Sequence, residues 1–227
     1  MKWHGAELQC ERGIMKRAER SGWRCLWKVV VLCVGVGSLA GFVACHSGPG
    51  ALSRTDGTAA EQQSVKDVRG VLVDPFEDKN AKARVFIFVR TDCPISNRYA
   101  PEIERLFRRY QGEGIRFWLV YPEDDVEREG VADHLAEYRL SLPALLDPGH
   151  VLVKKAKVEV TPEVAVFDQR GRLSYRGRID NRFVDFGKER AAPTERDLDI
   201  VLQAILQNKS IQRSTTTAVG CYISPQP

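Results

Sequence analysis

Residues 84–101 read RVFIFVRTDCPISNRYAP, and this stretch is predicted to pass from a strand into a helix. The run 84–89 is apolar, aromatic and β-branched, and its length fits only a buried strand. The next residues break the strand, and Ser96 or Asn97 is then predicted to cap a long helix. Cys93 therefore falls between a buried strand and the start of a helix.

The other elements follow from apolar periodicity and turn signals. Strands are predicted at residues 71–73, 115–121, 164–167 and 173–179, and helices at 96–110, 124–138, 151–158 and from Thr194, as N-cap, to about 206. Strands separated by helices imply parallel crossovers, and the closely spaced last two strands imply an antiparallel hairpin. The sequence thus predicts an α/β fold with a central mixed β-sheet flanked by helices.

The position of Cys93 favours a reactive thiol. Free backbone N–H groups and the positive end of the helix dipole stabilise a thiolate at a helix N-terminus, and the thiolate is the nucleophilic form. Pro94 fits the first helical turn, where its missing N–H costs nothing. The alternative for a lone cysteine is burial as an inert core residue.

Two segments resemble the thioredoxin superfamily, and most closely its redoxin or peroxiredoxin-like group. They are residues 86–101, with a single-cysteine CPIS motif, and Thr161-Pro162 about seventy residues later. The resemblance covers residues 66–209 and implies a thioredoxin-like fold. It also implies that Pro162 is a cis-proline packed beside the active cysteine and that Thr161 offers backbone groups to an extended thiol substrate.

The CPIS motif also departs from the patterns of that superfamily. Ser96 stands where thioredoxin-type reductases carry a second cysteine, so no disulfide can form within the motif. Peroxiredoxins carry Pro-x-x-x-Thr-x-x-Cys, whereas here Thr91 is one residue closer to the cysteine and Phe86 occupies the proline position. Asn97 stands where copper-delivery relatives carry their second cysteine, which leaves His134 or His150 as metal ligands only by coincidence of folding.

Two charged neighbours bear on the thiol. Arg98, one helical turn after Cys93, is a candidate for lowering the thiol pKa or holding an oxyanion, and the alternative is a solvated helix residue. Asp92 would oppose the thiolate if its carboxylate lay close to the sulfur.

Cys221 is the second candidate catalytic residue. It lies in an apolar island, residues 219–223, inside the polar tail 210–227, and such an island favours docking onto the domain. A docked tail would bring Cys221 to Cys93 as a resolving thiol, while a static disulfide and an unrelated tail thiol are the alternatives. The charged loop 181–193 is expected to contact a partner or the tail, or to be a plain surface loop.

The first 45 residues have the pattern of a lipoprotein-type signal peptide. A basic stretch precedes the apolar run 29–44, whose 16 residues are short for a membrane span of about 20. The following Cys45 resembles the lipidated cysteine of a bacterial lipobox. An uncleaved anchor and ordinary secretory cleavage are the alternatives, Met15 is a possible start, and all of them predict an extracytoplasmic domain behind a flexible linker, 46–65.

Charge and cysteine content narrow the function. The leader holds seven of the 34 Lys and Arg residues and three of the 30 Asp and Glu residues, so the net charge of +4 belongs to it and the rest is neutral. Nucleic-acid binding is therefore not expected. Loss of the leader and lipidation of Cys45 would leave two thiols, Cys93 and Cys221, in a compartment that permits disulfides.

These observations predict a membrane-anchored lipoprotein on the periplasmic side that acts as a thiol oxidoreductase. Its substrate would be a peroxide or a protein disulfide or thiol, its partner an external thiol reductant, and no cofactor is expected. The alternative is a binding module of thioredoxin fold, without turnover, that binds copper or docks a partner.

Overall fold

The computed structural model describes residues 64–224, and residues 1–63 and 225–227 lie outside that description. The predicted signal peptide, its Cys45 and Met15, and almost all of the predicted linker therefore lie outside the described residues. The described residues all belong to one compact unit, which spans residues 54–227. No helix in 64–224 is long and apolar enough to cross a membrane.

A seven-stranded sheet, with strand order β2-β1-β5-β4-β3-β7-β8, forms the centre of the domain. Its strands are β1 (Val65–Asp67), β2 (Leu72–Val73), β3 (Ala83–Phe88), β4 (Ile115–Tyr121), β5 (Ala144–Leu146), β7 (Glu163–Asp168) and β8 (Leu173–Gly177). β3, β4 and β5 are parallel, whereas β7, β8, β1 and β2 join antiparallel. The predicted mixed sheet is confirmed, including the antiparallel hairpin of its last two strands.

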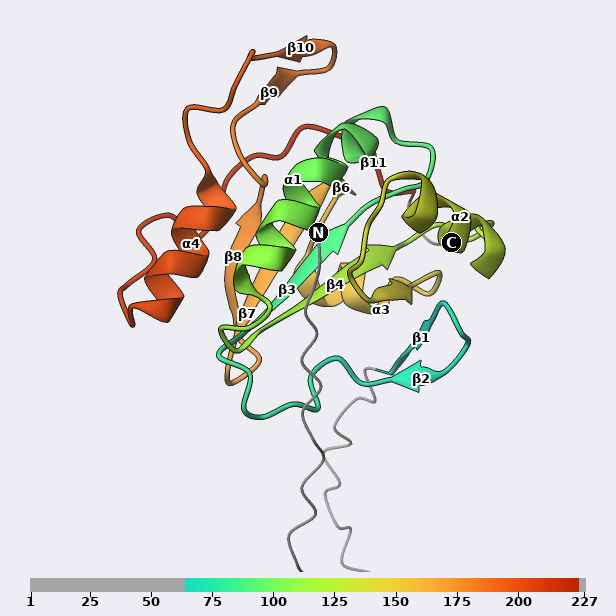
Figure 1. The fold of residues 1–227 in the computed structure, drawn as a ribbon, viewed down its shortest axis with the longest axis horizontal. Coiled ribbons are helices and arrows are strands. Elements are labelled where there is room, and N and C mark those ends of the chain that lie inside the picture. Colours follow the sequence, from blue (N-terminus) through green and yellow to red (C-terminus); the bar gives the residue numbers. More distant parts are fainter. Residues whose placement is uncertain (1–63, 225–227) are drawn as a thin grey trace, which may run out of the picture. The chain divides into compact units, whose positions relative to one another are not determined.

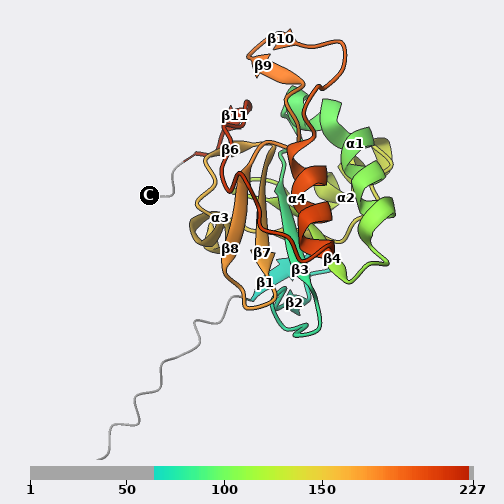
Figure 2. The ribbon, with the colours of Figure 1, turned by 90° about the vertical axis from the view of Figure 1, so that its left-hand side faces the viewer.

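Helices cover both faces of the sheet, as Figure 2 shows. They are α1 (Pro94–Tyr110), α2 (Arg128–Glu137), α3 (Val151–Ala156) and α4 (Asp197–Leu206). α1, α2 and α4 contribute to one apolar cluster and α3 to the other. The predicted α/β, thioredoxin-like arrangement is therefore confirmed.

Alternate residues of β3 pack into two different apolar clusters, one on each face of the sheet. Val85 and Ile87 belong to the cluster under α1, and Phe86 and Phe88 belong to the cluster under α3. All four side chains are fully buried because both faces of the sheet are covered. The strand is thus fixed on both faces, and the loop that follows it starts from a rigid support.

Two helix starts differ from the prediction. α1 begins at Pro94 with Cys93 as its N-cap, not at Ser96 or Asn97. The sulfur of Cys93 accepts the N–H of Ser96, the third residue of the helix, as a capping side chain does. The helix predicted from residue 124 begins only at Arg128, after an extended Glu127.

The start of α4 also differs from the prediction. Thr194 is not its cap, because α4 begins at Asp197 with Arg196 before it. The Asn181 side chain binds Thr194 instead: its Nδ2 donates to Thr194 Oγ1 at 2.7 Å, and its Oδ1 accepts the Thr194 N–H at 2.8 Å. Asn181, 13 residues earlier in the chain, thereby takes the hydroxyl that local sequence assigns to capping.

Several short strands were not predicted. β9 (Phe183–Asp185) and β10 (Lys188–Glu189) form a hairpin within the loop 181–193. Figure 1 shows this hairpin projecting at the end of the sheet where α1 begins. β6 (Val160–Thr161) and β11 (Cys221–Tyr222) form a separate two-stranded sheet. β1 and these four strands are two or three residues long, too short for a periodic signal.

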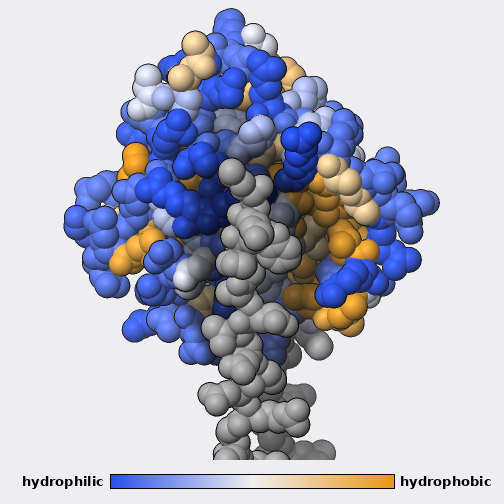
Figure 3. Space-filling model, in the orientation of Figure 1, coloured by the Kyte–Doolittle hydropathy of each residue, from blue (hydrophilic) through white to orange (hydrophobic). Residues whose placement is uncertain are grey.

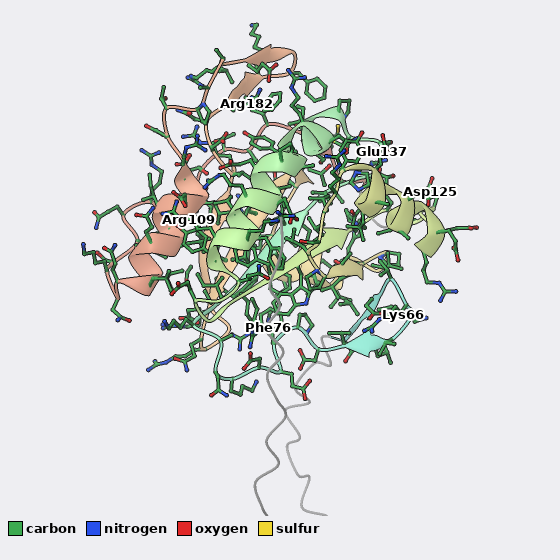
Figure 4. The ribbon with its side chains drawn as sticks, viewed as in Figure 1. Lys66, Phe76, Arg109, Asp125, Glu137 and Arg182 are labelled. Carbon is green, nitrogen blue, oxygen red and sulfur yellow. The ribbon has the colours of Figure 1, made fainter. Side chains whose placement is uncertain are left out.

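The helices on the α1 face are joined by charged contacts as well as by the core. Figure 4 shows Arg109 of α1 in the region between α1 and α4, and its guanidinium pairs with Asp199 of α4 at 3.2 Å. Tyr110 donates a hydrogen bond to the same carboxylate at 2.6 Å. On this face most of the visible surface is hydrophilic, with hydrophobic areas between (Figure 3).

Candidate active site

Cys93 lies at the N-terminus of α1, directly after the loop that leaves β3. Its backbone is extended, its carbonyl accepts the Asn97 N–H at 3.0 Å, and its Sγ accepts the Ser96 N–H at 3.5 Å. The exposed fraction of the residue is 0%. The thiol therefore occupies the N-cap position, where helix N–H groups face it, and it is enclosed by protein.

Opposing influences act on the Cys93 thiol. Burial raises its pKa, but hydrogen bonds from the Cys221 thiol and from Ser96 outweigh burial and hold the pKa below its ordinary value. The protonated thiol donates to the Thr161 carbonyl at 3.1 Å, a bond that the thiolate loses. The site is thus built to favour a thiolate that is shielded from solvent.

Thr161 and Pro162 lie beside this sulfur. The peptide bond between them is cis, and the Thr161 carbonyl is the acceptor for Cys93 Sγ. The structure therefore places both residues where the resemblance expects them. Thr161 is itself fully buried, because its outer backbone edge is not open to solvent.

The chain's own tail covers that edge. β11 pairs antiparallel with β6, with Cys221 opposite Thr161 and Tyr222 opposite Val160. The Ile223 N–H donates to the Glu159 carbonyl at 2.9 Å and extends the ladder. Cys221 thus lies where the resemblance would place an extended thiol substrate, and it packs against the apolar cluster that contains Cys93. Both thiols are free.

Gly220 makes this approach possible. A Cβ at residue 220 would lie 2.1 Å from the Thr161 carbonyl oxygen and 3.1 Å from Pro162 N. Such distances are far below van der Waals contact, so any side chain here would push β11 away from β6. Glycine before Cys221 is therefore a geometric requirement of the docked tail.

A second anchor holds the tail further back. The Thr216 N–H donates to the Arg176 carbonyl at 3.0 Å, and Thr216 Oγ1 is hydrogen-bonded to Tyr175 Oη at 2.7 Å. A Cβ at Gly177 would lie 2.3 Å from the Thr216 carbonyl oxygen. We name residues 214–223 the strap; it is anchored at β8 by Thr216 and at β6 by Cys221.

The thiol of Cys221 has the opposite character to that of Cys93. Burial, the hydrogen bond to Cys93 and the charge of Cys93 raise the pKa of Cys221 to about 12, and the negative charge of Asp92 acts in the same direction. The carboxylate of Asp92 is paired with Arg90 at 3.0 Å. The Cys221 thiol is therefore protonated at neutral pH.

Buried polar groups clamp Thr91, two residues before the candidate nucleophile. Glu123 Oε1 accepts the Thr91 N–H at 2.7 Å and its hydroxyl at 3.2 Å. Asn97 Nδ2 donates to the Thr91 carbonyl at 3.1 Å, and Asn97 Oδ1 is bonded to His134 Nε2 at 2.8 Å. His134 is bonded in turn to the Tyr121 hydroxyl at 2.9 Å. The network fixes the loop that carries Cys93.

The guanidinium of Arg98 is directed towards the β9–β10 hairpin. Its guanidinium pairs with Glu189 of β10 at 2.7 Å, and Arg98 is not among the groups that dominate the pKa of Cys93. Arg182, at the base of the hairpin (Figure 4), pairs with the same carboxylate at 3.2 Å. Arg98 thus ties α1 to the β9–β10 hairpin.

His134 and His150, the two candidate metal ligands, are buried and hydrogen-bonded to other protein groups. His150 Nε2 is bonded to the Pro122 carbonyl at 2.9 Å, and both nitrogens of His134 are used in the network above. Within residues 64–224, no group of three His, Cys, Asp or Glu side chains is placed to hold a metal ion.

Sequence reasoning missed Ser96, Glu123 and Gly220. The Ser96 hydroxyl is buried beside Cys93 and has no hydrogen-bond partner of ordinary geometry in the described chain, so it is free to donate to a thiolate or to a bound oxidant. Glu123 follows the strand predicted at 115–121, which places it at the same sheet edge as the loop after β3. Gly220 is visible in the sequence only as a glycine inside an apolar island.

Comparisons with known proteins agree with this geometry. The profile of the Redoxin family matches residues 56–187. No curated protein sequence shows significant similarity. A hypothetical protein from Sinorhizobium meliloti superposes with a TM-score of 0.62 at 23% identity, covering 70% of this chain and 88% of that chain. An uncharacterized conserved protein from Geobacillus kaustophilus gives 0.63 at 21%, covering 72% and 88%. These two share the fold of this chain.

Proposed function

The chain belongs to the redoxin family, and from that premise we propose that it is a thiol-dependent oxidoreductase that turns over through a Cys93–Cys221 disulfide. The observation that carries the proposal is that β11 pairs Cys221 with Thr161, whose carbonyl accepts from Cys93 Sγ at 3.1 Å, and that both thiols are free. Their pKa values are shifted in opposite directions. A low-pKa thiol attacks and a protonated neighbour resolves. The two roles are thus already divided between Cys93 and Cys221.

A peroxide is the oxidant that we favour. The Cys93 thiolate attacks one peroxide oxygen, the O–O bond breaks, and the alkoxide or hydroxide that leaves takes up a proton. Cys93 is then a sulfenic acid. Cys221 Sγ attacks this sulfur, the S–O bond breaks, and hydroxide leaves as water with the proton of Cys221. An external thiol donor reduces the disulfide.

The closed site supports a small oxidant. Cys93 has no exposed surface, and the strap occupies the backbone edge of Thr161. A protein disulfide would have to displace β11 from β6 before it reached the sulfur, whereas a peroxide needs only a local opening of a two-residue ladder. Disulfide exchange is therefore the alternative activity of the same thiols.

The neighbouring residues have positioning roles in this proposal. Thr161 and Pro162 hold the sulfur and the strap in register, and the Ser96 hydroxyl and N–H stabilise negative charge on Cys93. Arg98 takes no part in the chemistry and ties the hairpin to α1 instead. The leader sequence supports an extracytoplasmic, lipid-anchored location through Cys45, where disulfides persist.

Peptide-resolved mass spectrometry tests the proposal. The purified, reduced chain is treated with an equimolar amount of hydrogen peroxide, alkylated and digested. We expect a linked Cys93–Cys221 peptide that reductant abolishes, and in Cys221→Ser a dimedone adduct on Cys93. If both thiols remain alkylatable after peroxide but not after oxidised glutathione, the activity is disulfide exchange. If they survive both oxidants, the enzymatic proposal is wrong.

A further inference from the structure

We propose that the reducing electrons enter this chain at Cys221, and that their donor is an extended, cysteine-bearing segment that adds to the free edge of β11. The inference rests on the proposed function, because it concerns the reduction of the Cys93–Cys221 disulfide. It names the sulfur that is attacked and the surface that recognises the partner.

Access separates the two sulfurs. Cys93 is enclosed by α1, β6 and the strap, and its exposed fraction is 0%. Cys221, in contrast, is only half-buried. The next residue, Tyr222, is 78% exposed. A thiolate carried by a polypeptide can therefore approach Cys221 from solvent while the strap stays docked, but it cannot approach Cys93.

Leaving-group ability points to the same sulfur. In thiol–disulfide exchange the thiol of lower pKa leaves faster. The surroundings lower the pKa of Cys93 and raise that of Cys221 to about 12. Attack at Cys221 expels the better leaving group, Cys93, into a site with N–H and hydroxyl donors from Ser96. Attack at Cys93 would instead expel Cys221, the poorer leaving group.

The β11 strand offers a backbone edge next to this sulfur. Among residues 64–224, β11 pairs with β6 alone. The Ile223 N–H points to β6, where it donates to Glu159. Because successive N–H groups of a strand point to opposite edges, the Tyr222 N–H and carbonyl point away from β6. Figure 2 shows β11 beside β6 at the end of the sheet where α1 begins.

This edge fits a partner that is extended and carries a thiol. An incoming strand would pair with the outward groups of Tyr222, contact its exposed ring, and present its own cysteine opposite Cys221. The family resemblance places an extended substrate against Thr161, but the strap already fills that place in this chain. The docking edge is therefore displaced outward by one strand.

The reaction balances as a two-electron reduction. The donor thiolate attacks Cys221 Sγ, the Cys93–Cys221 bond breaks, and its electron pair leaves on Cys93 as a thiolate. A second donor thiolate attacks the donor sulfur of the mixed disulfide and releases Cys221 as a thiolate, which takes up a proton. Two donor thiols become one disulfide, and Cys93 and Cys221 are both reduced.

Rapid acid quenching locates the point of entry. The full chain is oxidised with diamide to the Cys93–Cys221 disulfide, mixed with an excess of an extended peptide that carries one cysteine, quenched, alkylated with N-ethylmaleimide and mapped. We expect the peptide adduct on Cys221 and maleimide on Cys93, with at least about a tenfold excess over the reverse, given the dependence on leaving-group pKa. An adduct mainly on Cys93 overturns the inference.

A pair of variants tests the docking edge. Tyr222→Pro removes the outward N–H without touching the ladder to β6, a placement that edge strands tolerate. Tyr222→Ala removes the ring and keeps the N–H. Relative to Tyr222→Ala, we expect Tyr222→Pro to lose about fivefold in the rate of reduction by the peptide, the scale of one hydrogen bond. Reduction by dithiothreitol should be equal in both.

These outcomes separate the inference from the proposed function. Diamide forms the disulfide without a peroxide, so the quench experiment runs even where the peroxidase activity fails. Equal peptide rates in Tyr222→Pro and Tyr222→Ala overturn the strand-addition part. A failure of peroxide to form the disulfide, with the adduct still on Cys221, overturns the oxidant in the proposed function and leaves the point of electron entry standing.

Discussion

Cys93 and Cys221 are close together but are held by opposite kinds of structure. Cys93 is held between long elements of regular secondary structure: a strand buried on both faces precedes it and a 17-residue helix follows it. A buried polar network around Thr91 fixes the loop that carries it. Cys221 is held by a two-residue ladder to β6 and by the Thr216 anchor. One sulfur is fixed by the core, and the other is carried by a strap.

The difference fits a division of labour. A nucleophile benefits from fixed donors that set its pKa, since these cost no reorganisation during reaction. A resolving thiol has to move, because a sulfenic oxygen must first be accommodated and then expelled. Short ladders open at low free energy, so the strap can make that movement while the core stays folded.

The largest effect is expected at the fixed sulfur. Cys93→Ser should lower peroxide-dependent thiol oxidation by at least about three orders of magnitude, the scale for removal of a covalent nucleophile. A stopped-flow peroxidase assay with dithiothreitol as reductant measures it. Its far-UV circular dichroism should match that of the unchanged chain, because serine fits the N-cap. Residual activity within tenfold of the original would transfer the nucleophile to another residue.

Removal of the strap's sulfur should leave the first step intact and stop the second. In Cys221→Ser the hydroxyl still donates to Cys93, so sulfenic acid should form within a few-fold of the normal rate, while excess peroxide carries Cys93 on to sulfinic acid. Intact mass after graded peroxide addition distinguishes the products. A Cys221→Ser chain that resists over-oxidation would mean that another thiol resolves Cys93.

A smaller effect is expected from displacing the strap without changing either sulfur. Gly220→Ala places a methyl group 2.1 Å from the Thr161 oxygen and should slow disulfide closure by about tenfold, because overpacking of this kind costs 1–3 kcal/mol. Quenched-flow alkylation measures closure. Gly112→Ala is the matched control, since no atom lies within 4 Å of a Cβ there. Equal closure rates would show that β11 need not stay docked.

The same contrast explains what could be predicted from the sequence. The fixed half is encoded locally: the buried run 84–89, the break after it and the helix periodicity place Cys93 at a strand-to-helix junction within one segment. The boundary errors at Ser96 and Thr194 have different causes: Cys93 occupies the cap position of α1, whereas the Thr194 side chain has another partner. For Thr194 that partner, Asn181, is brought in by the tertiary fold.

The half that carries Cys221 is encoded by contacts distant in sequence. Cys221 and Thr161 are paired across sixty residues, and no local pattern sets that register. The apolar island 219–223 predicts that the tail docks, but not where. Gly220 permits the register between β11 and β6, because only a glycine can lie so close to Thr161. Such a requirement becomes visible only when both backbones are placed.

The smallest effect tests the buried network on the fixed side. Burial raises the pKa of Glu123 although its Oε1 accepts two bonds from Thr91, and its Oε2 is buried without a partner in residues 64–224. A carboxyl whose pKa is higher in the folded than in the unfolded chain adds stability below the unfolded pKa and loses it as pH rises through the folded pKa. Glu123 should therefore contribute a loss of stability across that window on going from acid to neutral pH.

Glu123→Gln should remove that loss. The glutamine oxygen still accepts from Thr91, and no charge has to be buried, so the free energy of unfolding should fall less with rising pH by about 1 kcal/mol, a typical size for such a substitution. Urea unfolding of the reduced chain between about pH 4 and about pH 8 measures the slope. Exposed Glu113→Gln is the control and should keep the slope of the unchanged chain. Parallel slopes for Glu123→Gln and the unchanged chain would mean that Glu123 is neutral or ionised throughout, and that the clamp on Thr91 is insensitive to pH.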